Sequence, residues 1–258
     1  MYTQAFLTLA LTALAAATPI EKRATGSTAN EFTRGGCKDV MFAFARGSTE
    51  IGNMGTICGP QTSDGIKAAF GAGNVATEGI EYAAALAPNA LPGGTDAKSK
   101  QAMADILNKM ATQCPDSVIL AGGYSQGAAV SHRAIESLDP AVQNQIAGVI
   151  LYGDTQNTQD KAQIPGFDTA KTKIVCAPGD LVCTGSLVIL APHLSYGANA
   201  GEGAAFLVQK AQAAMAAKKR KRAEVAAEEA AKREAGHVAR KRVKVAVGMM
   251  AWRFQRLA

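Results

Sequence analysis

The chain has 258 residues, of which 48% are hydrophobic and 19% are charged. This length and composition fit one α/β domain with a full core and argue against two large domains. Residues 204–258 carry 14 Lys and Arg against 4 Glu, whereas residues 1–203 carry 13 Lys and Arg against 17 Asp and Glu. The positive net charge of +6 therefore comes from the C-terminal tail. The rest of the chain is slightly acidic, which argues against a basic, nucleic-acid-binding domain there.

The N-terminus predicts a secretory leader. Residues 5–17 form an apolar run of signal-peptide length, too short to span a bilayer, that ends in three alanines. Lys22 and Arg23 form a dibasic pair that is typical of propeptide processing. We therefore expect a signal peptide at 1–17, a short propeptide at 18–23 and an extracellular protein. An N-terminal helix of the mature fold is the alternative, disfavoured by missing caps and a following proline.

The cysteines also favour an oxidising compartment, in which pairing is the default. The chain has five of them: Cys37, Cys58, Cys114, Cys176 and Cys183. Cys176 and Cys183 are close enough in sequence to close one loop. A bond between Cys37 and Cys114 would tie the start of the fold to its middle, which leaves Cys58 unpaired. None of the spacings is typical of a zinc site.

Short apolar segments alternate with helical segments from residue 40 onward. Strands are expected at 40–45, 75–82, 118–121, 146–152 and 173–177. Helices are expected at 61–71, 96–113, 128–138 and 206–217, and a Pro/Gly-rich loop at 88–95. This alternation predicts a parallel sheet covered by helices on both faces. Such folds place the active site at the C-terminal ends of the strands.

The most informative stretch is Gly-Gly-Tyr-Ser-Gln-Gly at residues 122–127, between an expected strand and an expected helix. A serine between Gly123 and Gly127 in this context is the Gly-x-Ser-x-Gly nucleophile elbow. A Cβ at either glycine would collide where strand and helix come together. The elbow places the Ser125 hydroxyl at a helix N-terminus, which favours developing negative charge. Because the motif is short, a glycine-rich turn without chemistry is the alternative.

A serine nucleophile needs a general base, and the chain has three histidines. His132 lies on the elbow helix beyond Ser125 and points away from the elbow, so a surface or packed histidine is expected there. His237 lies in the charged tail, where a solvated role is the default. His193, on a loop after a proline, is therefore the candidate base.

The acid partner must orient the His193 imidazole, and in this fold it lies between the serine and the histidine in the chain. Asp180 and Asp154 both follow expected strands in that interval. Asp180 is favoured because it lies between Cys176 and Cys183, where a disulfide would hold its carboxylate. Asp154 is the second candidate, and either residue alone is compatible with a turn cap.

An oxyanion hole needs at least two donors. Gln126, which follows the nucleophile, supplies one backbone N–H. The second donor is expected from the loop at 46–49, where Ser48 offers both a backbone N–H and a hydroxyl. The alternative for this loop is a plain Ser/Thr turn.

Four motifs together resemble fungal cutinases from about residue 30 to about residue 215. They are Arg-Gly-Ser-Thr-Glu (46–50), Gly-Tyr-Ser-Gln-Gly-Ala-Ala (123–129), Gly-Asp-Leu-Val-Cys-Thr-Gly-Ser-Leu (179–187) and Ala-Pro-His-Leu-Ser-Tyr (191–196). The resemblance implies a three-layer α/β-hydrolase-like sandwich with a central, mostly parallel five-stranded sheet and no lid. It also implies a secreted enzyme that hydrolyses the ester bonds of cutin, the plant polyester.

The same resemblance implies a role for each candidate residue. Ser125, Asp180 and His193 would form the catalytic triad, and Ser48 and Gln126 would form the oxyanion hole.

Further implications of the resemblance concern the crevice and the disulfides. Asn89 would lie on a crevice loop and support Ser48. The apolar acyl crevice would be formed by Leu86, Leu187 and Ile189, with Tyr124 nearby. The favoured disulfides are Cys37–Cys114 and Cys176–Cys183.

Beyond the expected catalytic domain at 24–217, the basic tail at 218–258 has no counterpart in cutinases. It opens with Lys-Lys-Arg-Lys-Arg and continues rich in Ala, Lys, Arg and Glu. We expect a disordered or helical extension, or the product of a misread gene end. Electrostatic adhesion to acidic polysaccharide or membranes is a further alternative. Nucleic-acid binding is disfavoured for a secreted, disulfide-bearing enzyme.

The sequence therefore predicts a secreted, monomeric serine esterase that acts on cutin and on short-to-medium acyl esters through an acyl-enzyme. No metal or organic cofactor, nucleic-acid partner or stable membrane insertion is expected. A carbohydrate esterase such as acetylxylan esterase is the alternative enzyme, disfavoured by the apolar run at 187–190. An inactive surface-binding protein is the non-enzyme alternative, disfavoured by the complete set of triad residues.

Overall fold

Five strands form one sheet in which every strand pairing is parallel. In spatial order the strands are β2 (Val75–Gly79), β1 (Val40–Ala45), β3 (Val118–Tyr124), β4 (Ile146–Tyr152) and β5 (Thr172–Val175). In the centre of the register, Phe42 of β1 lies between Thr77 of β2 and Leu120 of β3. The first four strands are buried throughout. This burial explains the nearly continuous apolar sequences of β1, β3 and β4, whereas β2 also buries Thr77 and Glu78.

The structure is a computed structural model that describes the backbone of residues 24–255 and the side chains of residues 24–234. The expected signal peptide at 1–17 and propeptide at 18–23 lie outside the described residues, as does the end of the expected tail at 256–258.

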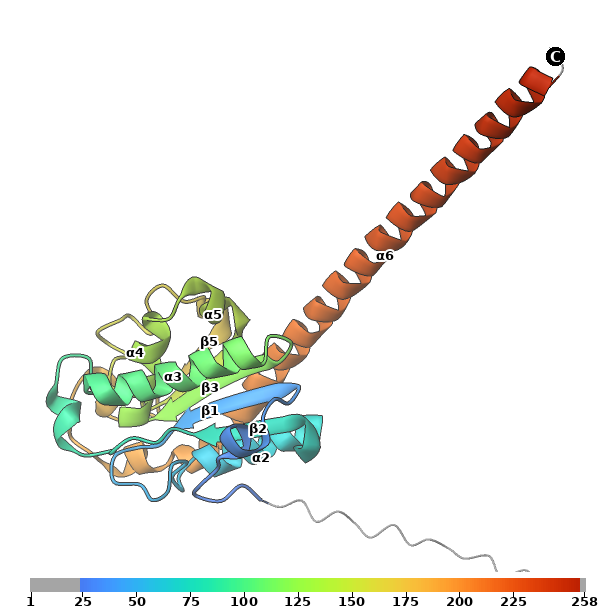
Figure 1. The fold of residues 1–258 in the computed structure, drawn as a ribbon. Helices are drawn as coiled ribbons and strands as arrows, with labels where there is room; N and C mark the ends of the chain where they lie inside the picture. Colours follow the sequence, from blue (N-terminus) through green and yellow to red (C-terminus); the bar gives the residue numbers. More distant parts are fainter. Residues whose placement is uncertain (1–23, 256–258) are drawn as a thin grey trace, which may run out of the picture.

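Helices cover both faces of the sheet, which confirms the predicted three-layer α/β fold (Figure 1). One face carries α3 (Ala97–Gln113), α4 (Gln126–Glu136) and the short α5 (Pro140–Gln145). The other face carries α2 (Gly59–Phe70) and the first turns of α6 (Ala200–Gln255), and α1 (Glu31–Gly35) contacts β2. Short 3₁₀ turns lie at Ala72–Asn74, Ala87–Ala90, Thr169–Lys171, Val182–Thr184, Ala191–Leu194 and Tyr196–Asn199.

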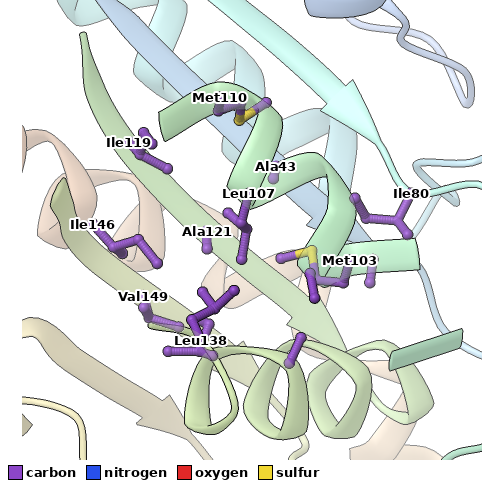
Figure 2. Close-up of a cluster of buried hydrophobic side chains, with 14 of the residues drawn as sticks. Ala43, Ile80, Met103, Leu107, Met110, Ile119, Ala121, Leu138, Ile146 and Val149 are labelled. Atoms are coloured by element: carbon purple, nitrogen blue, oxygen red, sulfur yellow. The ribbon is translucent and has the colours of Figure 1, made fainter. Parts of the chain in front are cut away.

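Each central strand contributes to two hydrophobic cores, because successive side chains of a strand point to opposite faces. In β1, Met41 packs toward α3 and α4, and Phe42 packs toward α2 and α6. Figure 2 shows the first of these cores, where side chains of α3 lie over β1, β3 and β4. The labelled residues are Ala43, Ile80, Met103, Leu107, Met110, Ile119, Ala121, Leu138, Ile146 and Val149.

Several element boundaries differ from the predicted ones, most clearly at the elbow. The strand continues to Tyr124 and the helix begins at Gln126, so Ser125 alone separates them. The prediction ended the strand at 121 and began the helix at 128, because glycine is a poor former of both elements. Pairing of β3 with β1 and β4 overrides this local preference.

Two disulfides are present, and they are the pairs that the resemblance favours. Cys37 joins Cys114 with their Cα atoms 5.5 Å apart, and Cys176 joins Cys183 at 6.0 Å. Cys58 is free and buried, which withholds it from an intermolecular bond. Burial, together with the nearby charge of a glutamate, raises the pKa of the Cys58 thiol and keeps it protonated.

The closing helix α6 begins at residue 200 rather than 206, and it continues through the expected domain boundary at 217 to residue 255 (Figure 1). Strong helix formers fill this segment, and neither proline nor glycine interrupts residues 204–235. Lys218 Nζ donates to the Ser117 carbonyl at 2.7 Å, and Arg222 pairs with Asp116. The start of the basic segment therefore contacts the domain. None of the helices in the described part has the length and apolar composition for crossing a membrane.

Candidate active site

Ser125 occupies a sharp turn at the C-terminal end of β3. Its φ of 55° lies in the left-handed region, which is strained for a residue with a Cβ. A Cβ at Gly123 would lie 2.1 Å from the Gly127 carbonyl oxygen, and a Cβ at Gly127 would lie 2.0 Å from the Ala45 carbonyl oxygen. The close approach of β1, β3 and α4 thus requires both glycines and holds Ser125 at the N-terminus of α4.

A chain of two hydrogen bonds links Ser125 to a buried carboxylate. The Ser125 Oγ lies 2.9 Å from His193 Nε2, and His193 Nδ1 lies 2.8 Å from Asp180 Oδ2. An ionised carboxylate can only accept, so Nδ1 carries the imidazole proton and Nε2 presents its lone pair to the Ser125 hydroxyl. The imidazole and the carboxylate are almost fully buried. This geometry allows His193 to take the proton of Ser125.

Two further donors fix the Asp180 carboxylate. The Val182 backbone N–H donates to Oδ1 at 3.0 Å, and the Tyr196 hydroxyl donates to Oδ2 at 2.6 Å. Burial, reinforced by the bond to Asp180, raises the pKa of Tyr196, so the hydroxyl stays protonated and remains a donor. Tyr196 is not among the residues predicted for the site, and its only signal in the sequence is its place inside the 191–196 motif.

Asp154, the second candidate acid, binds a different histidine. Its Oδ2 lies 2.7 Å from Nδ1 of His132 on α4, and both side chains are fully buried. The structure therefore does not bring Asp154 to His193. His132 is packed rather than at the surface, and the side chain of His237 lies outside the described residues.

Ser48 lies on the loop after β1 and lines the same crevice as Ser125. Asn89 Nδ2 donates to the Ser48 Oγ at 2.9 Å, as the resemblance implies. The backbone N–H groups of Ser48 and Gln126 donate to no acceptor within residues 24–234. Free N–H donors and an oriented hydroxyl beside a nucleophile are the groups that stabilise an oxyanion.

Glu50 sets the shape of the Ser48 loop. Its carboxylate accepts backbone N–H bonds from Gly47 at 2.7 Å, Thr56 at 2.8 Å and Ile57 at 2.9 Å. One side chain thus joins the Ser48 loop to a second segment that lines the crevice. Glu50 is not among the residues predicted for the site, although it ends the 46–50 motif.

The crevice above Ser125 has a volume of about 620 Å³ and is lined mainly by apolar side chains. All five predicted crevice residues line it: Leu86, Asn89, Tyr124, Leu187 and Ile189. Leu86 is 66% exposed and Ile189 is 51% exposed, so no described segment covers the rim, as a lidless fold requires. The missed lining residues include Ile51, Thr155, Val182 and Leu194. Within residues 24–234, no three His, Cys, Asp or Glu side chains are grouped to hold a metal ion.

The fold and the site together define a class of protein. A parallel sheet with a serine at the elbow after a central strand, bonded to a histidine and a buried aspartate, is the arrangement of serine hydrolases of the α/β-hydrolase type. The Cutinase family profile matches residues 36–211. The chain belongs to the cutinase family and is a carboxylic ester hydrolase of that type.

Individual relatives agree with this assignment. The chain is 47% identical over 205 residues to "Cutinase CUT2" of Pyricularia oryzae, covering 79% of this chain and 96% of the relative. It is 45% identical over 213 residues to "Cutinase 3" of Emericella nidulans, with shares of 79% and 96%.

Solved structures show the same fold. A Trichoderma reesei cutinase in complex with a phosphonate inhibitor has a TM-score of 0.65 and 35% identity, covering 72% of this chain and 80% of that one. An acetylxylan esterase has a TM-score of 0.52 and 21% identity, covering 68% of this chain and 100% of that one, which establishes a shared fold only.

Proposed function

We propose that Ser125, His193 and Asp180 hydrolyse carboxylic esters by acyl transfer. Ser125 Oγ attacks the ester carbonyl carbon while His193 Nε2 takes its proton, and the Asp180 carboxylate stabilises the imidazolium that forms. The tetrahedral oxyanion accepts hydrogen bonds from Ser48 and Gln126. The observation that carries the proposal is the hydrogen-bond chain from Ser125 to Asp180 at the floor of the crevice.

Two proton transfers by the same histidine complete the cycle. His193 donates its proton to the departing alcohol, which leaves Ser125 acylated. A water molecule then attacks the acyl carbon as His193 takes its proton, and the second tetrahedral intermediate collapses to release the acid and restore the Ser125 hydroxyl.

The proposed substrates are cutin and short-to-medium acyl esters. The named relatives are cutinases, and the crevice wall offers apolar side chains on which an acyl chain can lie. Leu187 and Ile189 line the crevice, and each is about half exposed. Apolar contact along the chain contributes about 0.8 kcal/mol per buried CH₂, so longer acyl groups gain more from this wall than acetate does.

Replacing Leu187 with serine is expected to lower kcat/KM for p-nitrophenyl octanoate about tenfold, because acyl contact is lost, and to change acetate turnover less than twofold. Initial rates across the acetate-to-octanoate series provide the measurement. Val188→Ser is the matched control, because Val188 is 52% exposed but does not line the crevice. Faster release of acetate from acetylated xylan than of acids from cutin would instead favour the carbohydrate-esterase alternative.

Secretion and the proposed processing rest on the leader sequence and on two disulfides, which persist in oxidising compartments. We propose a monomeric mature enzyme with a catalytic domain at 24–217, followed by the basic segment as a helical extension without a catalytic role.

The protein collected from the medium of a eukaryotic secretory host is expected to begin at Ala24 and to retain residues 218–258. Intact mass and N-terminal sequencing provide the measurement. Retention in the cell, or an intact residue 1, contradicts the leader, and a mass ending near 217 contradicts the extension.

A further inference from the structure

A second buried histidine, His132, anchors a cluster of charges beside the site. Its Nδ1 lies 2.7 Å from Asp154 Oδ2, and its Nε2 lies 3.2 Å from Asp160 Oδ2, within ion-pair distance although not aligned as a hydrogen bond. Arg133 Nη2 lies 2.6 Å from the same Asp160 oxygen, and Arg133 Nη1 lies 2.7 Å from Glu136. The mechanism proposed above uses none of these groups.

His132 lies between two carboxylates. Its Nδ1 is within hydrogen-bond distance of Asp154, and its Nε2 faces Asp160. Because the Asp154 side chain has no solvent exposure, removing His132 would leave a buried carboxylate without one of its few partners, which is costly.

Through Asp154 and Asp160 the cluster fixes both ends of the loop at 154–160. Asp154 Oδ1 accepts the Gln156 backbone N–H at 3.0 Å, and the Gln156 carbonyl accepts the Asp160 N–H at 3.0 Å. Gln156 Oε1 in turn accepts from Arg133 Nη2 at 2.6 Å. The loop is therefore held onto α4, the helix that begins at the elbow.

The same loop contacts the site at two places. Thr155 lines the crevice. Asn157 Nδ2 and Thr158 Oγ1 both donate to the Cys183 carbonyl, at 3.2 and 2.8 Å, within the disulfide-closed loop that carries Asp180.

Just before this loop, Gly153 packs against the catalytic imidazole. A Cβ at Gly153 would lie 2.9 Å from His193 Cε1, so the backbone there has no freedom to shift toward the site. Displacement of the loop would therefore move both His193 and Asp180.

We propose that His132 is a positioning residue for acyl transfer. It acts through the 154–160 loop, which holds the Asp180 loop and one wall of the crevice in place, and it touches no substrate. The proposal rests on the proposed function, because it assigns His132 to the geometry of the Ser125, His193 and Asp180 site.

Replacing His132 with glutamine tests the role, since glutamine can donate a hydrogen bond to Asp154 but has no second nitrogen to face Asp160. At a temperature well below the melting temperature, kcat for p-nitrophenyl butyrate is expected to fall about tenfold, with KM within twofold of wild type. The reason is that a small misplacement of catalytic groups slows the chemical step. Ser63→Ala is the control. It removes the hydrogen bonds of the Ser63 hydroxyl on α2, at the sheet face opposite α4, to Thr77 (2.7 Å) and Thr25 (2.9 Å), and it should lower stability without changing kcat.

Two further variants separate positioning from general stability. Thr158→Val removes a hydrogen bond to the Cys183 carbonyl. The kcat of the double variant with His132→Gln should be higher than the product of the two single losses predicts, because both residues act through one loop. Adding Asp154→Asn to His132→Gln places two amides side by side, which can hydrogen-bond each other without a buried carboxylate, and should restore part of kcat. If His132→Gln alone does not fold, this double variant is used to test the positioning role.

Unchanged kcat in His132→Gln, fully additive losses with Thr158→Val, or no recovery in the double variant would each overturn the positioning role. Ser125→Ala is measured alongside. If it keeps wild-type activity, the proposed function itself is wrong. If it is inactive while His132→Gln is unimpaired, only the role of His132 is rejected.

Discussion

Replacing Ser125 with alanine is expected to lower kcat for p-nitrophenyl butyrate by about 10⁵-fold, because among residues 24–234 the Ser125 hydroxyl is the nucleophile bonded to His193 Nε2. The Ser125 Oγ is the atom that faces the lone pair of His193 Nε2 in the crevice. Alanine preserves the packing of the elbow, since it removes only the hydroxyl. The measurement is the initial rate of ester hydrolysis, combined with the intact mass after treatment with an alkyl phosphonate.

Wild-type protein should gain the mass of one phosphonyl group, and the Ser125→Ala variant should gain none. Ser137→Ala is the matched control, because Ser137 follows the last residue of the same helix and its hydroxyl donates to the Ala134 carbonyl at 2.9 Å, away from the site. Its rate should stay within twofold of wild type. Retention of more than about one per cent of activity by Ser125→Ala would contradict its role as nucleophile.

The Asp180→Asn variant is expected to lose about 10⁴-fold in kcat through the wrong histidine tautomer. The Val182 N–H points at Oδ1 and cannot reverse, so the asparagine carbonyl oxygen must occupy that position. The amide NH₂ then occupies the Oδ2 position and donates to His193 Nδ1. His193 is left with its proton on Nε2, where it cannot accept the proton of Ser125. The Tyr196 hydroxyl can rotate to accept from the new amide, so the fold should tolerate the change.

Steady-state kinetics of Asp180→Asn should show the loss in kcat with little change in KM, because Asp180 does not line the crevice. Asp168→Asn controls for loss of a carboxylate, since Asp168 accepts the Ala170 N–H at 2.8 Å in an exposed turn. Combining Asp180→Asn with Ser125→Ala should cost no more than Ser125→Ala alone, because the residues act as a unit. A kcat within tenfold of wild type would show that Asp180 does not set the tautomer.

The strands and the elbow were predictable because their signals are local. Strands buried on both faces favour apolar side chains along their whole length, so β1 and β4 appear in the sequence as uninterrupted apolar runs. The elbow is a strand, a turn and a helix within a few residues, with glycines where backbone atoms nearly touch. With three histidines in the chain, two of them badly placed, His193 followed by elimination.

The extent of α6 was harder to predict for the opposite reason. The segment at 206–217 has an apolar face that packs on the domain, and the following basic residues have none, so composition indicates a boundary at 217. Helix propensity does not change there, and the backbone continues as one helix.

The sequence by itself determined the parallel α/β fold, the elbow and its serine, and the family that these motifs resemble, because local packing and backbone geometry leave a pattern in neighbouring residues. The sequence favoured Asp180 over Asp154 by its place between two cysteines, and the tertiary structure shows which carboxylate meets His193. Asp180 meets His193 because the chain returns over the sheet, whereas Asp154 is bound by His132. Glu50 and Tyr196 likewise act on groups brought together by folding, and contacts of that kind have no local signature.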